Sequence, residues 1–330
     1  MFQRYQCFLP YRIFGTTAED AFCRTGTETQ GPVSSTKNKA QCPKVGNPCN
    51  PGTGIKTQSE MVYRSLGANA LTLELIYNSR SPLLADAPPS WTGASAFGKN
   101  WVGTYERRLA VLTSGAVAGL RPDGRQWLYA VPGSGNRYVP DADVTDVLDR
   151  LVDAGNHTIG WTLTAATGDR LETYDAGGKL LSITDRDGTA QTLAYSDGTS
   201  GANGGFVLDA SGNPTTKVLP AGLLIRVTDF VGGTLSFGYN SVKRVVKMTD
   251  RAGQDFLLTY DADRNLASIT FPDSTVRTYH YGETAYTSGA SLPNHLTGIT
   301  DENGVRFATY QYDTLGRAIS TEHANGVEKY

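Results

Sequence analysis

The 330-residue sequence has few cysteines, no strong excess of charge and no long apolar run. The absence of an uninterrupted stretch of 18 apolar residues argues against a helical membrane span. Thirty Lys and Arg against 32 Asp and Glu leave a net charge of −2 with no basic block, which makes nucleic acid an unexpected partner. Residues 1–14 carry Arg4 and Arg12 and lack the apolar core of a secretory signal.

All the cysteines lie in the first 49 residues, at Cys7, Cys23, Cys42 and Cys49. Four cysteines allow three disulfide pairings, of which Cys42 with Cys49 and Cys7 with Cys23 is one. The intervening spacings of 15, 18 and 6 residues, without a nearby histidine, do not form a zinc knuckle. We expect disulfides here, with free thiols as the alternative because the compartment is not fixed.

The motifs of nucleophilic, metal-dependent and phosphate-binding enzymes are missing. Residues 132–135 lack the glycines that frame a nucleophilic serine, and the four histidines form no His-Glu-x-x-His pair. Residues 261–265 have the opening spacing of a calcium loop, but Leu266 and Pro272 stand where that loop needs Gly and Glu. The sequence therefore predicts no catalytic residue, no cofactor and no metal ligand.

What the sequence has is an internal repeat in its second half. The phrase Tyr-Asp, then a turn, then an apolar strand ending in Ser-Ile-Thr occupies residues 174–185 and returns at 260–270 and, in a looser form, at 312–321. The steps from Tyr174 to Tyr195, from Tyr239 to Tyr260 and from Tyr260 to Tyr281 are each 21 residues. A fixed period of this size indicates a repeat architecture whose units bury their apolar faces against their neighbours.

Each unit holds two predicted strands and two predicted turns. The stretches 180–184 and 266–270 alternate in polarity and suit a pleated surface. A first turn, of the Asp-x-x-Gly or Asp-x-x-Asn kind, follows the tyrosine, and a second turn follows the Ser-Ile-Thr strand, as in 185–188. Gly and Asn tolerate the positive φ of tight turns, and Asp can accept bonds from turn amides. Because a lone hairpin is marginal in water, successive hairpins are predicted to join one antiparallel sheet.

This repeated sequence pattern resembles that of the Rhs, or YD-repeat, family. The positions that carry it are the tyrosines, aspartates and glycines of the units: Tyr174, Asp175, Gly178, Tyr260, Asp261, Tyr312, Asp313 and Gly316. Residues 46–56 and 71–79 are similar to the module that commonly opens such proteins, and 123–129 and 161–174 look like degenerate units. The resemblance thus covers roughly residues 46–330.

The resemblance implies an all-β, spiralling sheet that is part of a hollow β-shell. It implies a non-catalytic role in enclosing or delivering a toxin in competition between bacteria, outside the cell or at its surface. The partners would be the remainder of the shell, a C-terminal toxin cargo or another chain with a free β-edge. The repeat tyrosines would stack as ladders along the sheet, with a structural role.

A cell-surface binding module for a glycan or protein is the alternative function. An exposed aromatic patch at Trp91, Trp101 and Trp127 would favour it. The family's self-cleaving Asp-Pro segment has no counterpart after Tyr312. The sequence stops where another strand is expected to begin, at 327–330, so we interpret it as a fragment whose last strand is a free edge.

The expected organisation has four parts. Residues 1–45 form a cysteine-containing tail and linker, 46–82 the opening module, 83–170 a degenerate β-repeat region, and 171–330 the YD repeats. Whether 83–170 joins the same sheet or forms a separate lobe is left open.

Overall fold

The computed structural model describes residues 54–67, 69–79, 95–123, 126–142, 144–166 and 169–323, together with the backbone of three short strands before them. The chain divides into two compact units, Met1–Lys37 and Asn38–Tyr330. The first holds an antiparallel hairpin of β1 (Tyr11–Phe14) and β2 (Phe22–Thr25). The cysteine side chains, Trp91 and the expected edge at 327–330 lie outside the described residues.

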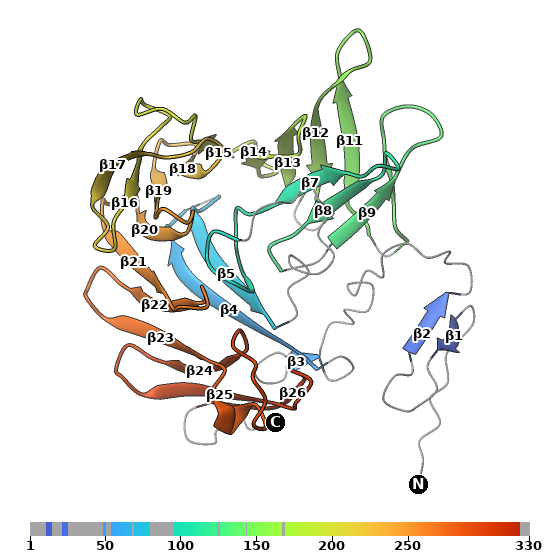
Figure 1. The fold of residues 1–330 in the computed structure, drawn as a ribbon. Helices are drawn as coiled ribbons and strands as arrows, with labels where there is room; N and C mark the ends of the chain where they lie inside the picture. The colour runs from blue at the N-terminus through green and yellow to red at the C-terminus, as the bar shows by residue number, and fades with distance from the viewer. Residues whose placement is uncertain are drawn as a thin grey trace. The chain divides into compact units, whose positions relative to one another are not determined.

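The second unit is dominated by a 14-stranded antiparallel sheet, which confirms the predicted all-β class (Figure 1). Its strands, in order, are β11 (Val147–Val152), β12 (Thr158–Thr164), β13 (Leu171–Asp175), β14 (Leu180–Thr184), β15 (Ala190–Tyr195), β18 (Leu224–Thr228), β19 (Thr234–Tyr239), β20 (Val245–Thr249), β21 (Asp255–Tyr260), β22 (Leu266–Thr270), β23 (Val276–Tyr281), β24 (Leu296–Thr300), β25 (Arg306–Tyr312) and β26 (Ala318–His323). Each strand pairs with its neighbour along this order, so the sheet grows hairpin by hairpin.

First and second turns share one geometry. The N–H of the first turn residue donates to the carbonyl four residues later, as Asp175 does to Lys179. The N–H of the fourth turn residue donates to the carbonyl of the first, as Gly178 does to Asp175. The fourth residue has a positive φ, 82° at Gly178 and 75° at Gly316, which glycine adopts without strain. In the turn after Asp261 the positive φ, 68°, falls on Arg264 rather than on the asparagine next to it.

Asn265, which the sequence marks as the turn residue, is fully buried. Its backbone N–H donates to Asp261 Oδ1 at 2.8 Å, and its side-chain amide donates to Asp261 Oδ2 and to the carbonyl of Pro293. The expectation that Asn265 supplies the positive φ is therefore wrong, because its side chain is used to tie this turn to the next loop.

The repeat is interrupted twice. Between β15 and β18 the chain leaves the sheet as a separate hairpin, β16 (Phe206–Leu208) with β17 (Pro214–Val218). Leu208 of this hairpin packs against the sheet at Gly238 in β19, so closely that a Cβ on Gly238 would lie 2.3 Å from Leu208 Cδ1. Between β23 and β24 a longer loop holds the short 3-10 helix η1 (Thr284–Tyr286).

Two four-stranded sheets precede the repeats. The first joins β3 (Cys49–Asn50), β4 (Ile55–Arg64), β5 (Thr72–Asn78) and β6 (Trp101–Gly103). The second joins β7 (Arg108–Val111), β8 (Val117–Leu120), β9 (Gln126–Ala130) and β10 (Val139–Pro140). Residues 54–79 and 95–109 are called the module below. In the region 83–170, β11 and β12 thus belong to the large sheet, whereas β7 to β10 form their own.

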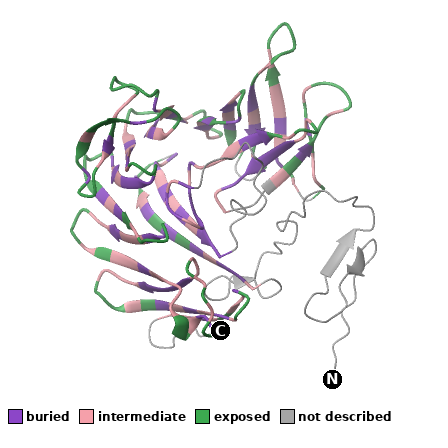
Figure 2. Ribbon diagram, viewed as in Figure 1, coloured by how far each residue is buried: buried purple, intermediate pink, exposed green. Residues whose placement is uncertain are grey.

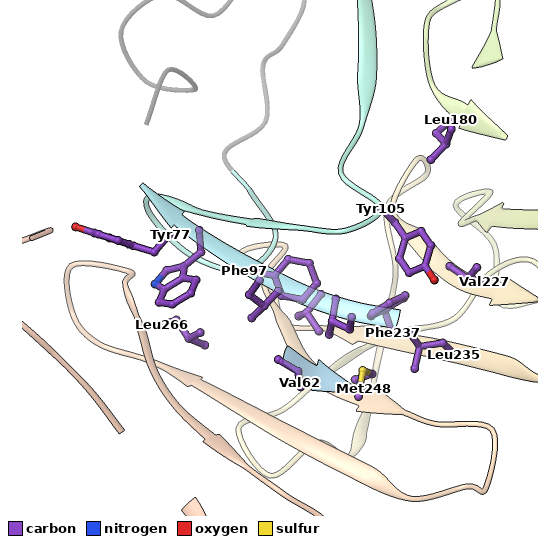
Figure 3. Packing of buried hydrophobic residues seen from close by; sticks show 14 of the residues in the cluster. Val62, Tyr77, Phe97, Tyr105, Leu180, Val227, Leu235, Phe237, Met248 and Leu266 are labelled. Carbon is purple, nitrogen blue, oxygen red and sulfur yellow. The ribbon is translucent and has the colours of Figure 1, made fainter. Parts of the chain in front are cut away.

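The strands of the large sheet run round β4 and β5, and the core lies between them (Figures 1 and 2). Along β5, Leu73, Leu75 and Tyr77 are fully buried. Figure 3 shows module side chains among those of the repeats, including Phe97 beside Phe237, whose ring centroids are 6.3 Å apart. One hydrophobic cluster therefore unites the module with the inner face of the repeat sheet.

Candidate functional site

The most elaborated site is the junction between the module and the first turns of the repeats. Four of the first turns, or the strand that follows each, form backbone bonds with the module. The backbone bonds are Leu109 N to Gly178 O (2.8 Å), Val245 N to Ala96 O (2.9 Å), Lys99 N to Arg264 O (3.1 Å) and Ala318 N to Gly54 O (2.7 Å). The module is thus bonded to the first-turn end of the sheet at points from β14 to β26.

The repeat tyrosines link each hairpin to the one before it. Five of their hydroxyls donate to the carbonyl of the first residue of an earlier strand, and the pairs are Tyr195 to Leu180 (2.7 Å), Tyr239 to Leu224 (2.7 Å), Tyr260 to Val245 (2.7 Å), Tyr281 to Leu266 (2.8 Å) and Tyr312 to Leu296 (2.8 Å). The hydroxyl of Tyr174 donates to Glu172 instead. No ring contact joins two of the repeat tyrosines, all of which lie in the described part of the chain. The expected stacked ladder is therefore wrong, and hydroxyl-to-carbonyl bonds take its place.

The repeat aspartates bind their own turns. Asp313 Oδ1 accepts from the N–H groups of Leu315 and Arg317, each at 2.9 Å, and its second oxygen pairs with the Arg317 guanidinium. Burial alone would raise the pKa of Asp313, but the backbone bond from Arg317 and its charge lower it below the usual value. These contacts agree with a structural role for the aspartates, which stays a prediction.

Gly178 shows how closely the module approaches a first turn. A Cβ at this position would lie 2.1 Å from the carbonyl oxygen of Leu109, whereas one at Gly188, in the following second turn, would meet nothing within 4 Å. The two glycines have the same φ, 82° and 83°.

We therefore expect Gly178→Ala to destabilise the protein more than Gly188→Ala. Backbone strain should cost both variants about 1–2 kcal/mol. Overpacking against Leu109 should add about 1–3 kcal/mol in Gly178→Ala alone. Urea unfolding of the two variants measures the difference. Equal losses would show that the module does not press on this turn.

Trp101, from β6, anchors the module in the repeats. It is fully buried, its ring centroid lies 5.2 Å from that of Tyr279, and its indole N–H donates to the hydroxyl of Tyr281 at 2.7 Å. Trp127 is half-buried, with the Arg121 guanidinium 4.7 Å from its ring centroid. Trp101 is therefore not part of an exposed aromatic patch, the feature that would favour a binding module, because this ring fills the junction.

A buried ionic cluster lies where the second small sheet meets β13. Glu172 is fully buried and accepts bonds from Arg121, Arg107 and the hydroxyl of Tyr174. Burial by itself raises the pKa of Glu172, but the hydrogen bonds and charges of Arg121 and Arg107 outweigh it, so the pKa falls to about 2. Sequence reasoning missed this cluster, since nothing in the spacing of 107, 121 and 172 brings the three residues together.

The inward row of β4 is polar rather than apolar. Lys56, Gln58 and Glu60 are all buried. Gln58 accepts from Lys56 Nζ and from the hydroxyl of Tyr310 and donates to Glu60, which pairs with Arg277. Lys56 Nζ also lies 4.2 Å from the ring centroid of Tyr310. A buried polar row of this kind fixes the register of β4 against the repeats, because a one-residue slip would unpair every member.

The junction contains no acid, base and nucleophile in catalytic contact among the residues described above. His280 bonds to Thr300 on the outer face of the sheet, and the exposed His157 bonds to Asp153. In the described part of the chain, no three His, Cys, Asp or Glu side chains gather as a metal site. No helix of the described residues is long and apolar enough to cross a membrane.

Comparison with known proteins gives one family match. Residues 46–129 match a family described as a domain of unknown function, DUF6531, which spans the predicted opening module and β4 to β9. No curated protein matches the chain.

Solved structures that match the chain have low sequence identity to it and low TM-scores. A TcdB2–TccC3 crystal structure without the hypervariable C-terminal region is 15% identical, with a TM-score of 0.30, over 82% of this chain and 19% of that one. The Tc holotoxin pore of Photorhabdus luminescens, with a mutated TccC3, is 14% identical, with a TM-score of 0.31, over 82% and 18%. The chain spans about a fifth of the length of these proteins, and overlaps this small carry no conclusion on function.

Proposed function

We propose that this chain is a non-catalytic segment of an Rhs-type β-shell that encloses or delivers a toxin, in competition between bacteria. The Tyr-Asp repeats, the DUF6531 match and the antiparallel sheet built hairpin by hairpin support this proposal. The protein would act outside the cell that makes it, and its partners would be further shell, a polypeptide cargo or another chain with a free β-edge.

The observation that carries the proposal is the junction. The module covers the inner face of the repeat sheet and bonds to its first turns from Gly178 to Ala318. A scaffold needs such a filled end, because an inner sheet face left open to water would expose its apolar residues. In this proposal the module closes one end of the shell, and a cargo is enclosed by repeats that continue the sheet.

The alternative, a surface module that binds a glycan or protein, needs an exposed aromatic patch. Trp101 is fully buried in the junction, and Trp127 is covered by Arg121. These two tryptophans therefore do not support this alternative.

The test is protection of a cargo in the protein as the producing cells make it. The native protein is purified, treated with a nonspecific protease, and the surviving polypeptides are identified by mass spectrometry. We expect a polypeptide outside residues 1–330 to survive digestion, and to be degraded once the sheet is unfolded by denaturant. A parallel competition assay should show that deletion of the gene abolishes killing of neighbouring bacteria.

The absence of any protected polypeptide would overturn enclosure. Killing that persists in the deletion strain would overturn the role in competition. Catalytic turnover of any substrate by the isolated chain would contradict the proposal that it is non-catalytic.

A further inference from the structure

A groove of about 690 Å³ opens at the end of the sheet that carries the second turns. Its apolar side consists of Tyr63, from the end of β4, with Phe256 and Phe271 from the repeats. The three rings pack edge to face, with centroid distances of 6.0 Å from Phe256 to each of the other two. Tyr63 and Phe271 are only partly buried, so their rings are open to a ligand.

The turn that lines this groove departs from the repeat. The second turns that follow β14, β18, β20 and β24 open on aspartate and carry glycine at the positive-φ position, as Asp185 and Gly188 do. Between β22 and β23 these positions hold Phe271 and Ser274, and Ser274 keeps a φ of 69°. The turn thus gives up an aspartate cap and places a non-glycine residue in a strained conformation. A unit that breaks the local rules of its neighbours is where a functional site is expected.

The module strand is also distorted at the groove. The pairing of β4 with β5 shifts register between Met61 and Tyr63, a β-bulge at the end of an otherwise regular ladder. Bulges turn a side chain away from the alternation of its strand. Tyr63 consequently reaches the rings of the repeats, with an edge-to-face contact to Phe256.

The groove carries an excess of negative charge. Its lining includes the carboxylates of Asp250, Asp273 and Glu302. Two cations lie near the groove, and each also pairs with a carboxylate outside its lining. Arg277 is shared between Glu302 (2.8 Å) and Glu60, and Arg251 pairs with Asp229 at 3.3 Å, so carboxylates remain in excess. Aromatic faces and nearby carboxylates together attract a cation through ring quadrupoles and full charges.

We propose that this groove binds a cationic side chain, the guanidinium of an arginine or the ammonium of a lysine, presented by a partner protein that docks on the second-turn end of the sheet. The proposal is independent of the shell function, which requires no ligand on this end of the sheet. Charge decides for a cationic residue over a neutral sugar, since a saccharide would leave the acidic lining uncompensated.

The test is a titration of the full chain with the peptide acetyl-Gly-Arg-Gly-Arg-Gly-amide, followed by NMR shifts at about 20 mM and about 300 mM salt. The control peptide carries citrulline, which keeps the shape of arginine without its charge. We expect binding of the arginine peptide only, weakening at the higher salt.

Two matched variants place the site. Asp273 and Asp187 occupy the same position of their turns, and each accepts from the N–H and hydroxyl of the threonine two residues on. Asp273→Asn should weaken peptide binding about three- to tenfold, and Asp187→Asn should leave it unchanged. Phe271→Asn removes the ring. Asparagine is chosen because it already opens the turn after Tyr239, where the side chain of Asn240 accepts from two backbone amides. This substitution should weaken binding at least threefold.

Equal binding of the citrulline peptide would overturn the proposal, as would equal effects of Asp273→Asn and Asp187→Asn. Binding of an oligosaccharide such as chitotriose to the groove, without binding of the arginine peptide, would replace the cation by a sugar. If Phe271→Asn does not fold, the aspartate pair decides alone.

Discussion

Glu172→Gln should lower the free energy of unfolding by about 3–5 kcal/mol, because it leaves the buried guanidinium of Arg121 and the partly buried one of Arg107 without their anion. The carboxylate is fully buried and bonds to both Arg121 and Arg107. Glutamine keeps the shape of the side chain, so the loss reports the charge and not a cavity. Urea unfolding at pH 7 measures it.

An exposed ion pair provides the control. Arg137 and Asp149 pair at 3.0 Å, but the arginine side chain is 72% exposed. Asp149→Asn should therefore cost far less stability than Glu172→Gln. A loss for Glu172→Gln as small as that for Asp149→Asn would mean that water reaches the cluster.

The stabilisation that Glu172 provides should depend on pH. The pKa of Glu172 is near 4.5 in the unfolded chain and about 2 in the folded protein. A carboxyl whose folded pKa is lowered stabilises the protein fully above the unfolded value, and this contribution is lost as the pH falls towards the folded value. The difference between the wild type and Glu172→Gln should shrink by about 3 kcal/mol between pH 5 and pH 2. A difference that stays constant over this range would contradict the assignment.

Trp101→Ala should cost about 3–5 kcal/mol, the second large effect. The substitution empties a fully buried site between the module and β23, and it removes the bond from the indole N–H to Tyr281. Because this ring joins the two layers, we expect the module to become accessible to protease before the repeats do.

Trp127→Ala is the matched control. Trp127 is half-buried in β9, outside the module, and its replacement should cost less than Trp101→Ala. Limited proteolysis with mass spectrometry shows which segment is cut first. First cleavage within the repeats of Trp101→Ala would show that the module does not depend on this contact.

The sequence predicted the repeats well because their information is local. The strands expected at 180–184 and 266–270 are β14 and β22 to the residue, and the turn glycines Gly178 and Gly316 have the expected positive φ. Period-two alternation and turn chemistry are read from neighbouring residues, so no knowledge of the packing is needed.

The sequence could not predict which surfaces become interior. Along β4 both faces carry polar residues, so alternation does not reveal that Lys56, Gln58 and Glu60 turn inward. Trp101 looks like a surface aromatic until the repeats cover it. The groove depends on a bulge at Tyr63 and on two deviations in one turn, and Tyr63 lies about 190 to 240 positions before the other lining residues. Long-range pairing of this kind leaves no local signal.

The length of the junction along the chain bears on how the protein is made. Gly54 leaves the ribosome roughly 260 residues before Ala318, to which its carbonyl bonds, a delay of roughly 13–50 s at ordinary rates of synthesis. During that delay the apolar side of β5 awaits hairpins that arrive one at a time. We therefore expect the module to act as a template on which each newly made hairpin docks in the order of translation. A pause or truncation leaves it partly covered, and such intermediates are the ones that chaperones recognise.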